Sequence, residues 1–472
     1  MPFFWHALIA FAAEAGTECV LKLTRVPSMS KKMECIINKP QRYIFVSMKH
    51  RIIGITTLLL FACSFLMAQD AVHFRSVIRE LSSEKYQGRS DYKNGDKKAA
   101  RFLVREFKGI DGIEPALQDG YLQPFSYGVN VFHKKMEMSI DGVEMTPGTD
   151  FIVREFSPSQ KGSYPLAYIT EEDHHPERLL PLLQTGKFKN SYVVLQFDLV
   201  YKYLGIAPEV LYTKPLAGLI LVRDGQPSFF KSRSGKMQPV PVIWVSPEFP
   251  VDAKEITVRF ESKWIKDHSS ANVIALLPGT DRKDSCIVFI AHYDHLGHFG
   301  KDVFYPGAND NASGTAFLLT LAHYYSLPEN RPDLTYVFIA AGAEENNLLG
   351  STYYTENPVI PLDKTLQVIN LDMVADNGNR LFVETGPEGE ASLEKFKDIN
   401  ERLNLFGTIE QHPLSNDSDH YPFAIRNVPA LYIMVDGDAY SVYHTPLDDY
   451  HHIYTTRYSD LFRLVTEFAS IF

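Results

Sequence analysis

The chain has 472 residues, 45% of them hydrophobic and 22% charged, which is the composition of a globular protein and the length of two or three domains. Its formal net charge of -10 argues against nucleic acid as a partner. Three of the four cysteines lie in the first 68 residues, so a chain without that segment has no internal disulfide and relies on its core.

Residues 1–68 have the layout of a leader with a signal peptide. A short basic start precedes the apolar run 52–68, which is slightly short for a membrane span. We therefore expect cleavage after Ala68, no stable membrane insertion afterwards, and a secreted or periplasmic protein. Lipid attachment at Cys63 and a membrane anchor are the alternatives. Residues 1–47 precede the methionine that starts this signal, so translation can begin after them.

Residues 69–131 begin with two amphipathic helices, and Asp96 precedes the second. In residues 132–263 short β-type runs separated by turns replace the helical pattern, so we expect a β-rich inserted domain there. Structural packing is its default role, and a binding or lid role is the alternative. The apolar positions at helical spacing are Phe74, Val77, Ile78 and Leu81 in the first helix and Ala100, Leu103 and Phe107 in the second.

Residues 264–472 alternate apolar strands with helices, which predicts a mostly parallel sheet covered on both faces. The fold class we expect is therefore α/β, with three α/β/α layers and the β-rich insert. The expected strands are 272–277, 287–291, 336–340, 366–371 and 431–435, and the expected closing helix is 456–470.

Acidic and histidine residues follow four of these strands. Ligands of open α/β sheets bind at the carboxyl ends of the strands, so these side chains are expected to converge. Imidazole and carboxylate groups in this number suit two divalent cations, zinc most naturally. The residues are His292, Asp294 and Asp310 after the first such strand, Glu344 and Glu345 after the second, Asp372 after the third, and Tyr443, His444 and Asp448 after the last.

These motifs resemble the dinuclear zinc aminopeptidase family, which also includes the glutamate carboxypeptidase II type. The resemblance extends from about residue 72 to the end, and the middle region resembles a protease-associated insert. It implies that Glu344 is the general base and that Asp294 is the partner of His292. It also implies two zinc ions per chain, with His292 and Asp372 holding one, Glu345 and His444 holding the other, and Asp310 bridging both.

The adjacent glutamates suit hydrolysis, since one can accept a proton from the attacking water while its neighbour anchors the metal. Glu344 then passes the proton to the leaving amine. Tyr443 precedes a metal ligand and is a candidate donor to the tetrahedral oxyanion. A tyrosine that only packs is the alternative.

Other polar residues have structural interpretations. We interpret His295 and His298 as loop residues or as residues behind the metal ligands. Ser418, Asp419 and His420 are sequence neighbours, which does not place them in the geometry of a catalytic triad, so we interpret residues 418–420 as scaffold at a helix start. Cys286 opens a strand and is expected to be a buried small hydrophobe. The sequon at Asn311 lies inside the predicted metal turn, which disfavours glycosylation.

We therefore expect a secreted zinc-dependent exopeptidase that removes N-terminal amino acids from peptides. Three alternatives stay open. A carboxypeptidase of the glutamate carboxypeptidase type would need a basic pocket, for which Arg380 and Arg426 are candidates. A glutaminyl-peptide cyclase would use one zinc ion, and a non-enzymatic receptor-like relative would typically lose metal ligands. Side-chain preference and oligomeric state do not follow from the sequence.

Overall fold

The computed structural model describes residues 71–173, 175–198, 200–201, 205, 208–231, 236–250 and 252–472. The expected signal peptide, its cleavage after Ala68 and the lipidation alternative at Cys63 lie outside the described residues. Within the described part of the chain, no helix is both long and apolar enough to cross a membrane.

Two helices open the described chain, as the apolar spacing predicts. Residues 71–81 are helical, and Phe74 and Leu81 on their apolar face are fully buried. The second helix is α3 (Gly95–Lys108), which has Asp96 in its first turn. The 3-10 turns η1 (Glu84–Arg89) and η2 (Tyr92–Asn94) connect the two helices.

A nine-stranded sheet forms the larger body of the fold, with the order β1-β11-β15-β12-β16-β19-β17-β18 and β2 beside β11. The four central strands β15, β12, β16 and β19 run parallel, whereas β11 runs antiparallel to β15, and β17 runs antiparallel to β19 and parallel to β18. The predicted parallel sheet is therefore confirmed at its centre. The strands are β1 (Glu114–Pro115), β2 (Leu122–Val131), β11 (Lys263–Leu277), β12 (Arg282–His292), β15 (Leu334–Ala341), β16 (Thr365–Leu371), β17 (Arg380–Thr385), β18 (Thr408–His412) and β19 (Ala430–Asp436).

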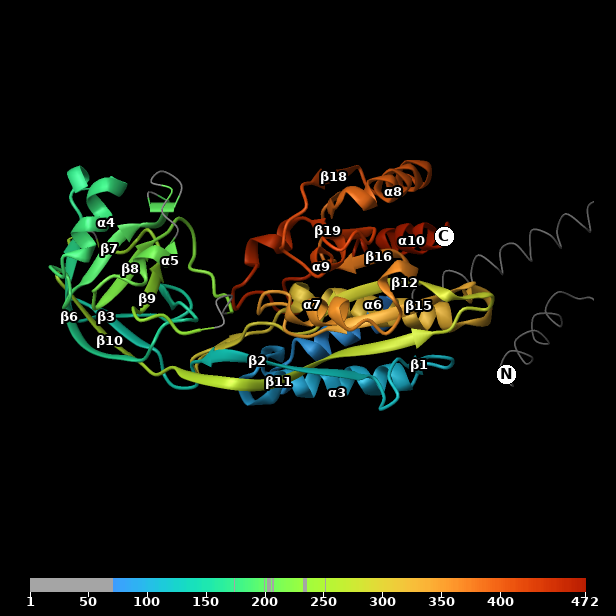
Figure 1. Cartoon of the computed structure of the whole chain (residues 1–472), viewed down its shortest axis with the longest axis horizontal. Helices are drawn as coiled ribbons and strands as arrows, with labels where there is room; N and C mark the ends of the chain where they lie inside the picture. Colours follow the sequence, from blue (N-terminus) through green and yellow to red (C-terminus); the bar gives the residue numbers. More distant parts are fainter. Residues whose placement is uncertain are drawn as a thin grey trace, which may run out of the picture. The chain divides into compact units, whose positions relative to one another are not determined.

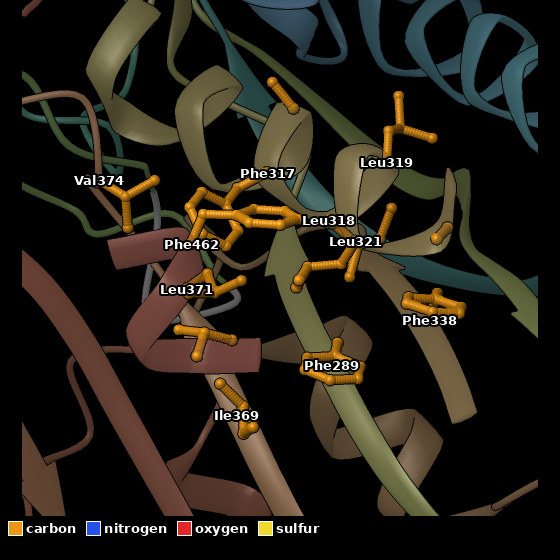
Figure 2. Packing of buried hydrophobic residues seen from close by; sticks show 14 of the residues in the cluster. Phe289, Phe317, Leu318, Leu319, Leu321, Phe338, Ile369, Leu371, Val374 and Phe462 are labelled. Atoms are coloured by element: carbon orange, nitrogen blue, oxygen red, sulfur yellow. The ribbon is translucent and has the colours of Figure 1, made fainter. Parts of the chain in front are cut away.

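Helices cover both faces of this sheet, because successive side chains of its buried strands point to opposite sides. Ile287 and Phe289 of β12 belong to the core shared with α3, α6, α8 and α10, and Figure 2 shows this packing around α6. Val288 and Ile290 belong to the core shared with α7 and α9. The three expected layers are therefore present. These helices are α6 (Gly314–Ser326), α7 (Leu349–Glu356), α8 (Glu390–Leu403), α9 (Tyr421–Ala424) and α10 (Tyr458–Ala469).

Cys286 lies in the second of these cores as a free, fully buried thiol. Burial raises its pKa to about 11, so the thiol stays protonated at neutral pH. The prediction that it acts as a small buried hydrophobe is confirmed.

A separate eight-stranded sheet, drawn mainly in green in Figure 1, confirms the predicted β-rich insert, although its limits at 132–263 stay a prediction. Its order is β4-β3-β10-β6-β7-β8-β9-β5, and it packs its own hydrophobic cores. Strands β2 and β11 pair antiparallel on the way into and out of this region. The strands are β3 (Glu137–Ile140), β4 (Val143–Met145), β5 (Phe151–Val153), β6 (Gln160–Tyr168), β7 (Tyr192–Gln196), β8 (Gly218–Val222), β9 (Val242–Val245) and β10 (Glu255–Phe260).

Candidate metal centre

The five predicted metal ligands converge at the carboxyl edge of the central strands, and the side chains of all five are at most 7% exposed. Each comes from a different segment, so the sheet edge and its loops set their spacing. They are His292 at the end of β12, Asp310 in η5 (Ala308–Ser313), Glu345 after β15, Asp372 after β16 and His444 after η9 (Asp438–Val442).

The ligand atoms form two groups that share Asp310. In the first group, Nε2 of His292 lies 3.3 Å from Oδ1 of Asp310 and 3.3 Å from Oδ1 of Asp372. In the second group, Nε2 of His444 lies 3.0 Å from Oδ2 of Asp310 and 3.5 Å from Oε2 of Glu345. The two oxygens of Asp310 thus face different groups, which is the arrangement that a bridging carboxylate requires.

The chemistry of these atoms fits a metal centre. Oδ1 of Asp372 and Oε1 of Glu345 are buried and have no hydrogen-bond partner among the described residues. A buried carboxylate oxygen without a partner costs free energy unless a cation binds it. Nitrogen and oxygen donors of this kind suit zinc. The residues present can therefore hold metal ions, while the individual ligand assignments stay predictions.

Asp294 holds the turn that carries the two glutamates. Its Oδ1 accepts the backbone N–H of Glu344 at 3.0 Å, and its Oδ2 accepts that of Glu345 at 3.3 Å. The same carboxylate lies 3.9 Å from Nδ1 of His292, beyond hydrogen-bond distance, whereas the backbone oxygen of Asp294 lies 3.2 Å from that nitrogen. Side-chain support of His292 by Asp294 therefore stays a prediction.

The two glutamates differ in what they face. Glu344 lines a cavity of about 280 Å³, and Glu345 does not. Burial raises the pKa of Glu344 well above its ordinary value, and the charge of Glu345 adds to this against the opposing effect of His292. Glu344 is therefore the glutamate that can exchange a proton with a molecule in the cavity.

The lining of the cavity beside the metal cluster combines apolar and acidic side chains. Arg380 pairs with Glu410 and Asp436, Arg426 pairs with Glu356, and neither arginine lines the cavity. No lysine or arginine of the described chain is among its lining residues. Besides the metal cluster, that lining consists of the apolar Phe230, Met373, Phe382 and Met434, the tyrosines Tyr432, Tyr440 and Tyr443, and the acidic Glu344, Glu384 and Asp417.

Tyr443 lines the cavity and stacks on the ring of His444, with ring centroids 3.7 Å apart. Burial raises the pKa of its hydroxyl well above the ordinary value, so the hydroxyl keeps its proton and can donate a hydrogen bond. The stacking shows that Tyr443 packs against a predicted ligand, and its role toward an oxyanion stays a prediction.

Two buried residues outside the predicted ligand set support the centre: Asp448, which the sequence placed among the converging residues without a role, and Arg89, to which it gave no role there. Arg89 donates hydrogen bonds to five backbone carbonyl oxygens, including those of Tyr293, Gly307 and Asp310. Asp448 accepts the backbone N–H of Asn309 at 2.7 Å and that of Asp310 at 3.0 Å. Both therefore fix the turn of Asp310 from outside the predicted ligand set.

Residues 418–420 contact partners other than one another. Ser418 donates to Oδ2 of Asp372 at 2.7 Å, and Nε2 of His420 lies 3.3 Å from Glu384. The predicted helix start is present, since α9 follows His420 directly. Asn311 is fully buried and donates to the backbone oxygen of Leu371, so its amide nitrogen is engaged within the fold.

Known proteins share this fold and part of this sequence. Peptidase family M28 matches residues 272–469. Aminopeptidase YwaD of Bacillus subtilis (strain 168) is 32% identical over 249 residues, which are 49% of this chain and 51% of that protein. A glutamate carboxypeptidase 2 homolog of Caenorhabditis elegans is 28% identical over 253 residues, which are 47% of this chain and 31% of that protein. The chain thus spans about half or less of the curated relatives it matches.

Among solved structures, BSAP, a zinc aminopeptidase from Bacillus subtilis, superposes with a TM-score of 0.63. The match covers 84% of this chain and 94% of that one at 23% sequence identity. At this identity the likeness establishes the fold, which includes both the mixed sheet and the β-rich region.

Proposed function

We propose that the chain is a zinc-dependent exopeptidase that removes N-terminal amino acids from peptides, and the match of residues 272–469 to peptidase family M28 supports this proposal. One observation carries this proposal, namely a cavity that is lined both by buried metal-binding groups and by further acidic side chains. The positive charge of a free peptide amino terminus suits this acidic lining, in which Asp417 is exposed, whereas Glu384 is buried and contacts Ser415 and His420. A carboxypeptidase would need a basic group for the substrate carboxylate, and the described lining offers none.

We further propose two zinc ions per chain, one held by His292, Asp310 and Asp372 and the other by Asp310, Glu345 and His444. Bound zinc in such a pair would polarise the scissile carbonyl and lower the pKa of the attacking water.

Four groups of the protein itself then have separate roles in the reaction. Glu344 accepts a proton from the attacking water and passes it to the leaving amine. Asp294 fixes this base through the backbone N–H that it accepts. The hydroxyl of Tyr443 donates to the developing oxyanion. The apolar wall formed by Met373 and Phe382 receives the side chain of the terminal residue.

We also propose that the protein is secreted or periplasmic. The basic start and apolar run of residues 48–68 support this proposal. Fractionation of cells that express the complete chain, with N-terminal sequencing of the exported product, tests it.

Hydrolysis of matched peptides tests the activity. The chain from Gln69 onward is incubated with peptides that have free or blocked amino termini, before chelation, after chelation, and after zinc is restored. We expect zinc-dependent release of residues from free amino termini only. Cleavage of blocked peptides from their carboxyl ends would identify a carboxypeptidase, and ring closure of N-terminal glutamine would identify a cyclase. Bound zinc without any turnover would favour the receptor-like alternative.

The adjacent glutamates supply a matched pair of variants for the assigned roles. Glu344→Gln removes the proposed base, so we expect kcat to fall by about 10²–10⁴-fold while zinc content stays unchanged. Glu345→Gln removes a proposed ligand, so zinc content should fall with activity. Equal loss of zinc in both variants would contradict the division of roles.

A further inference from the structure

His295 lies inside the metal cluster although it is outside the predicted ligand set. Its side chain is fully buried. Its Nδ1 lies 2.9 Å from Oε1 of Glu345 and 3.6 Å from Oδ2 of Asp310. Ligand atoms of these three residues lie within 4.8 Å of one another. A third imidazole therefore faces the shared carboxylate of Asp310.

The close contact between His295 and Glu345 does not have the geometry of a hydrogen bond, although the two side chains interact electrostatically. Neither Nδ1 of His295 nor Oε1 of Glu345 has a hydrogen-bond partner among the described residues, although the two atoms are 2.9 Å apart. Two ligands on one tetrahedral zinc ion, each at about 2.0–2.1 Å from it, lie roughly 3.3 Å apart. Nδ1 of His295 and Nε2 of His444 lie 2.9 to 3.6 Å from carboxylate oxygens of Asp310 and Glu345, which is close to that separation.

The fold holds the ring of His295 in this place. Gly307 has a φ of +62°, and a Cβ added there would lie 2.4 Å from Cδ2 of His295. The ring therefore packs directly on the backbone of the turn that carries Asp310. Arg89 fixes the same turn by donating to the backbone oxygens of Gly307 and Asp310. His295 is thus held by the structure that also positions the bridging carboxylate.

His298 provides a contrast within the same segment. Its ring stacks on Tyr92, with centroids 4.1 Å apart, and it belongs to neither of the metal-binding clusters found among the described residues. His295 therefore belongs to a metal-binding cluster, whereas His298, only three residues further along the chain, does not.

We propose that His295 is an additional metal ligand in the second group, beside Asp310, Glu345 and His444. The proposal rests on the metal centre of the proposed function, and it does not depend on which peptides are cleaved. It makes the two cation sites unequal, because the first group offers one imidazole and the second offers two. Imidazole favours borderline ions such as zinc over manganese and magnesium, so the second group fills first when zinc is limiting.

The test is zinc binding to the purified protein, with His295→Gln as the variant and His298→Gln as its matched control. Metal-free protein is loaded with one equivalent of zinc, and X-ray absorption counts the imidazoles bound to it. Titration in a zinc buffer gives the affinity. We expect two imidazoles in the wild type and in His298→Gln, one in His295→Gln, and a loss of affinity in His295→Gln of more than about 100-fold. Loss of a partner behind the ligands typically costs only about 10–100-fold.

Other outcomes decide against the proposal. An unchanged imidazole count in His295→Gln, or a smaller loss of affinity, would make His295 a positioning residue. Should His295→Gln fail to fold, as judged by circular dichroism, His295→Cys replaces it, since a thiolate is also a zinc ligand. That variant should lose one imidazole and gain one sulfur ligand. Tight zinc binding without peptidase activity would contradict the proposed function and leave this assignment intact.

Discussion

At the scale of single residues, Arg89 shows how a side chain far from the ligands in sequence can support the centre. Its guanidinium is fully buried and donates to backbone oxygens of residues 81, 293, 306, 307 and 310. Burial lowers its pKa to about 10, against the raising effect of Asp310, so the group stays charged at neutral pH. A planar fork with five N–H donors matches this ring of acceptors, and an ammonium group does not.

Replacing Arg89 by Lys should therefore be costly in spite of the conserved charge. The change leaves buried carbonyl oxygens without donors, and each such group costs about 1–3 kcal/mol. We expect the free energy of unfolding in urea to fall by about 3–5 kcal/mol. The exposed Arg75 offers a control, since Arg75→Lys should change the stability by less than about 0.5 kcal/mol. Equal stability of both variants would show that the hydrogen bonds of the Arg89 guanidinium group are not needed for stability.

Ser418 supports a predicted ligand directly. It donates to Oδ2 of Asp372 and leaves Oδ1 directed at His292. Ser418→Ala frees that carboxylate to rotate, so we expect zinc affinity to fall by about 10–100-fold with little change in fold. The exposed Ser441, which donates only to a nearby backbone oxygen, is the control. Zinc titration compares the two variants, and equal affinities would leave Ser418 without a role at the centre.

The sequence predicted the ligands that stand next to strand ends, because a motif and a strand boundary coincide there. His292, Glu345 and Asp372 were predicted in this way, and their role as ligands stays a prediction. His295 was interpreted as a loop or supporting residue, since spacing alone cannot tell whether a ring turns into a cluster or away from it. The contacts of Arg89 join segments more than 200 residues apart, and only the folded chain brings them together.

At the scale of elements, the buried parallel strands were the most predictable, because continuous apolar runs mark them. β15 and β16 match the expected strands closely. The expected strand at 272–277 is instead the end of the longer β11, which begins at Lys263 because β2 pairs with its polar first half. β18 was not predicted, since its exposed residues form no apolar run.

A segment of the β-rich region reaches the cavity and is held there at both ends. Phe229 packs on Phe299 with centroids 5.4 Å apart, and Lys231 forms a buried ion pair with Asp91 at 2.7 Å. Between them, Phe230 lines the cavity and contacts the ring of His444 with centroids 4.7 Å apart. The segment thus adds an apolar wall to the candidate site.

Phe230→Ala should weaken substrate binding, because it removes this wall. Loss of one apolar contact surface costs about 1–3 kcal/mol, so we expect kcat/KM to fall by roughly tenfold or more, mostly through KM. Phe197 packs on Trp244 outside the cavity lining and supplies the control Phe197→Ala. A series of peptides with small and large terminal side chains measures the effect. An unchanged KM for all of them would remove Phe230 from the substrate site.

The ion pair between Lys231 and Asp91, next to Phe230 in the chain, should contribute to the stability of the fold. Lys231→Met leaves the buried carboxylate of Asp91 with His133, at 4.0 Å, as its remaining ion-pair partner, and loss of a buried partner costs about 3–5 kcal/mol. Lys134→Met breaks an exposed pair with Glu261 and should cost at most about 1 kcal/mol. Urea unfolding of both variants at pH 7 measures the difference. Equal losses would show that the pair of Lys231 and Asp91 is no stronger than a surface pair.

The pH dependence of the same variant has a defined sign. Burial would raise the pKa of Asp91, but Lys231 outweighs it and holds that pKa below its ordinary value. A group with a depressed pKa contributes stability above its unfolded pKa and loses it as the pH falls through its folded pKa. The stability gap between the wild type and Lys231→Met should therefore narrow below about pH 4. A gap that widens in acid would contradict the pairing.

At the scale of the whole molecule, the change of pattern after residue 131 predicted a separate β-rich region, and a second sheet is present. The sequence did not predict whether this region contributes residues to the cavity. Lys231 and Asp91 are 140 residues apart, and no periodicity relates them. The contribution of this region to the cavity follows from how loops of the insert fold, which depends on tertiary packing rather than on local pattern.

The proposed metal centre should also stabilise the molecule as a whole, because its predicted ligands come from five segments around the sheet edge. An ion that binds the folded state only adds about 4 kcal/mol at 1,000 times its Kd. For a chain of roughly 400 folded residues that corresponds to a rise in Tm of about 5 °C. We expect chelation to lower Tm by about this amount and zinc, but not magnesium, to restore it, as followed by calorimetry. Asp372→Asn is the control, since the loss of a ligand should reduce the response of Tm to zinc. A Tm that changes with neither chelator nor zinc would mean that the cluster binds no cation that stabilises the fold. That result would contradict the proposed zinc-dependent chemistry.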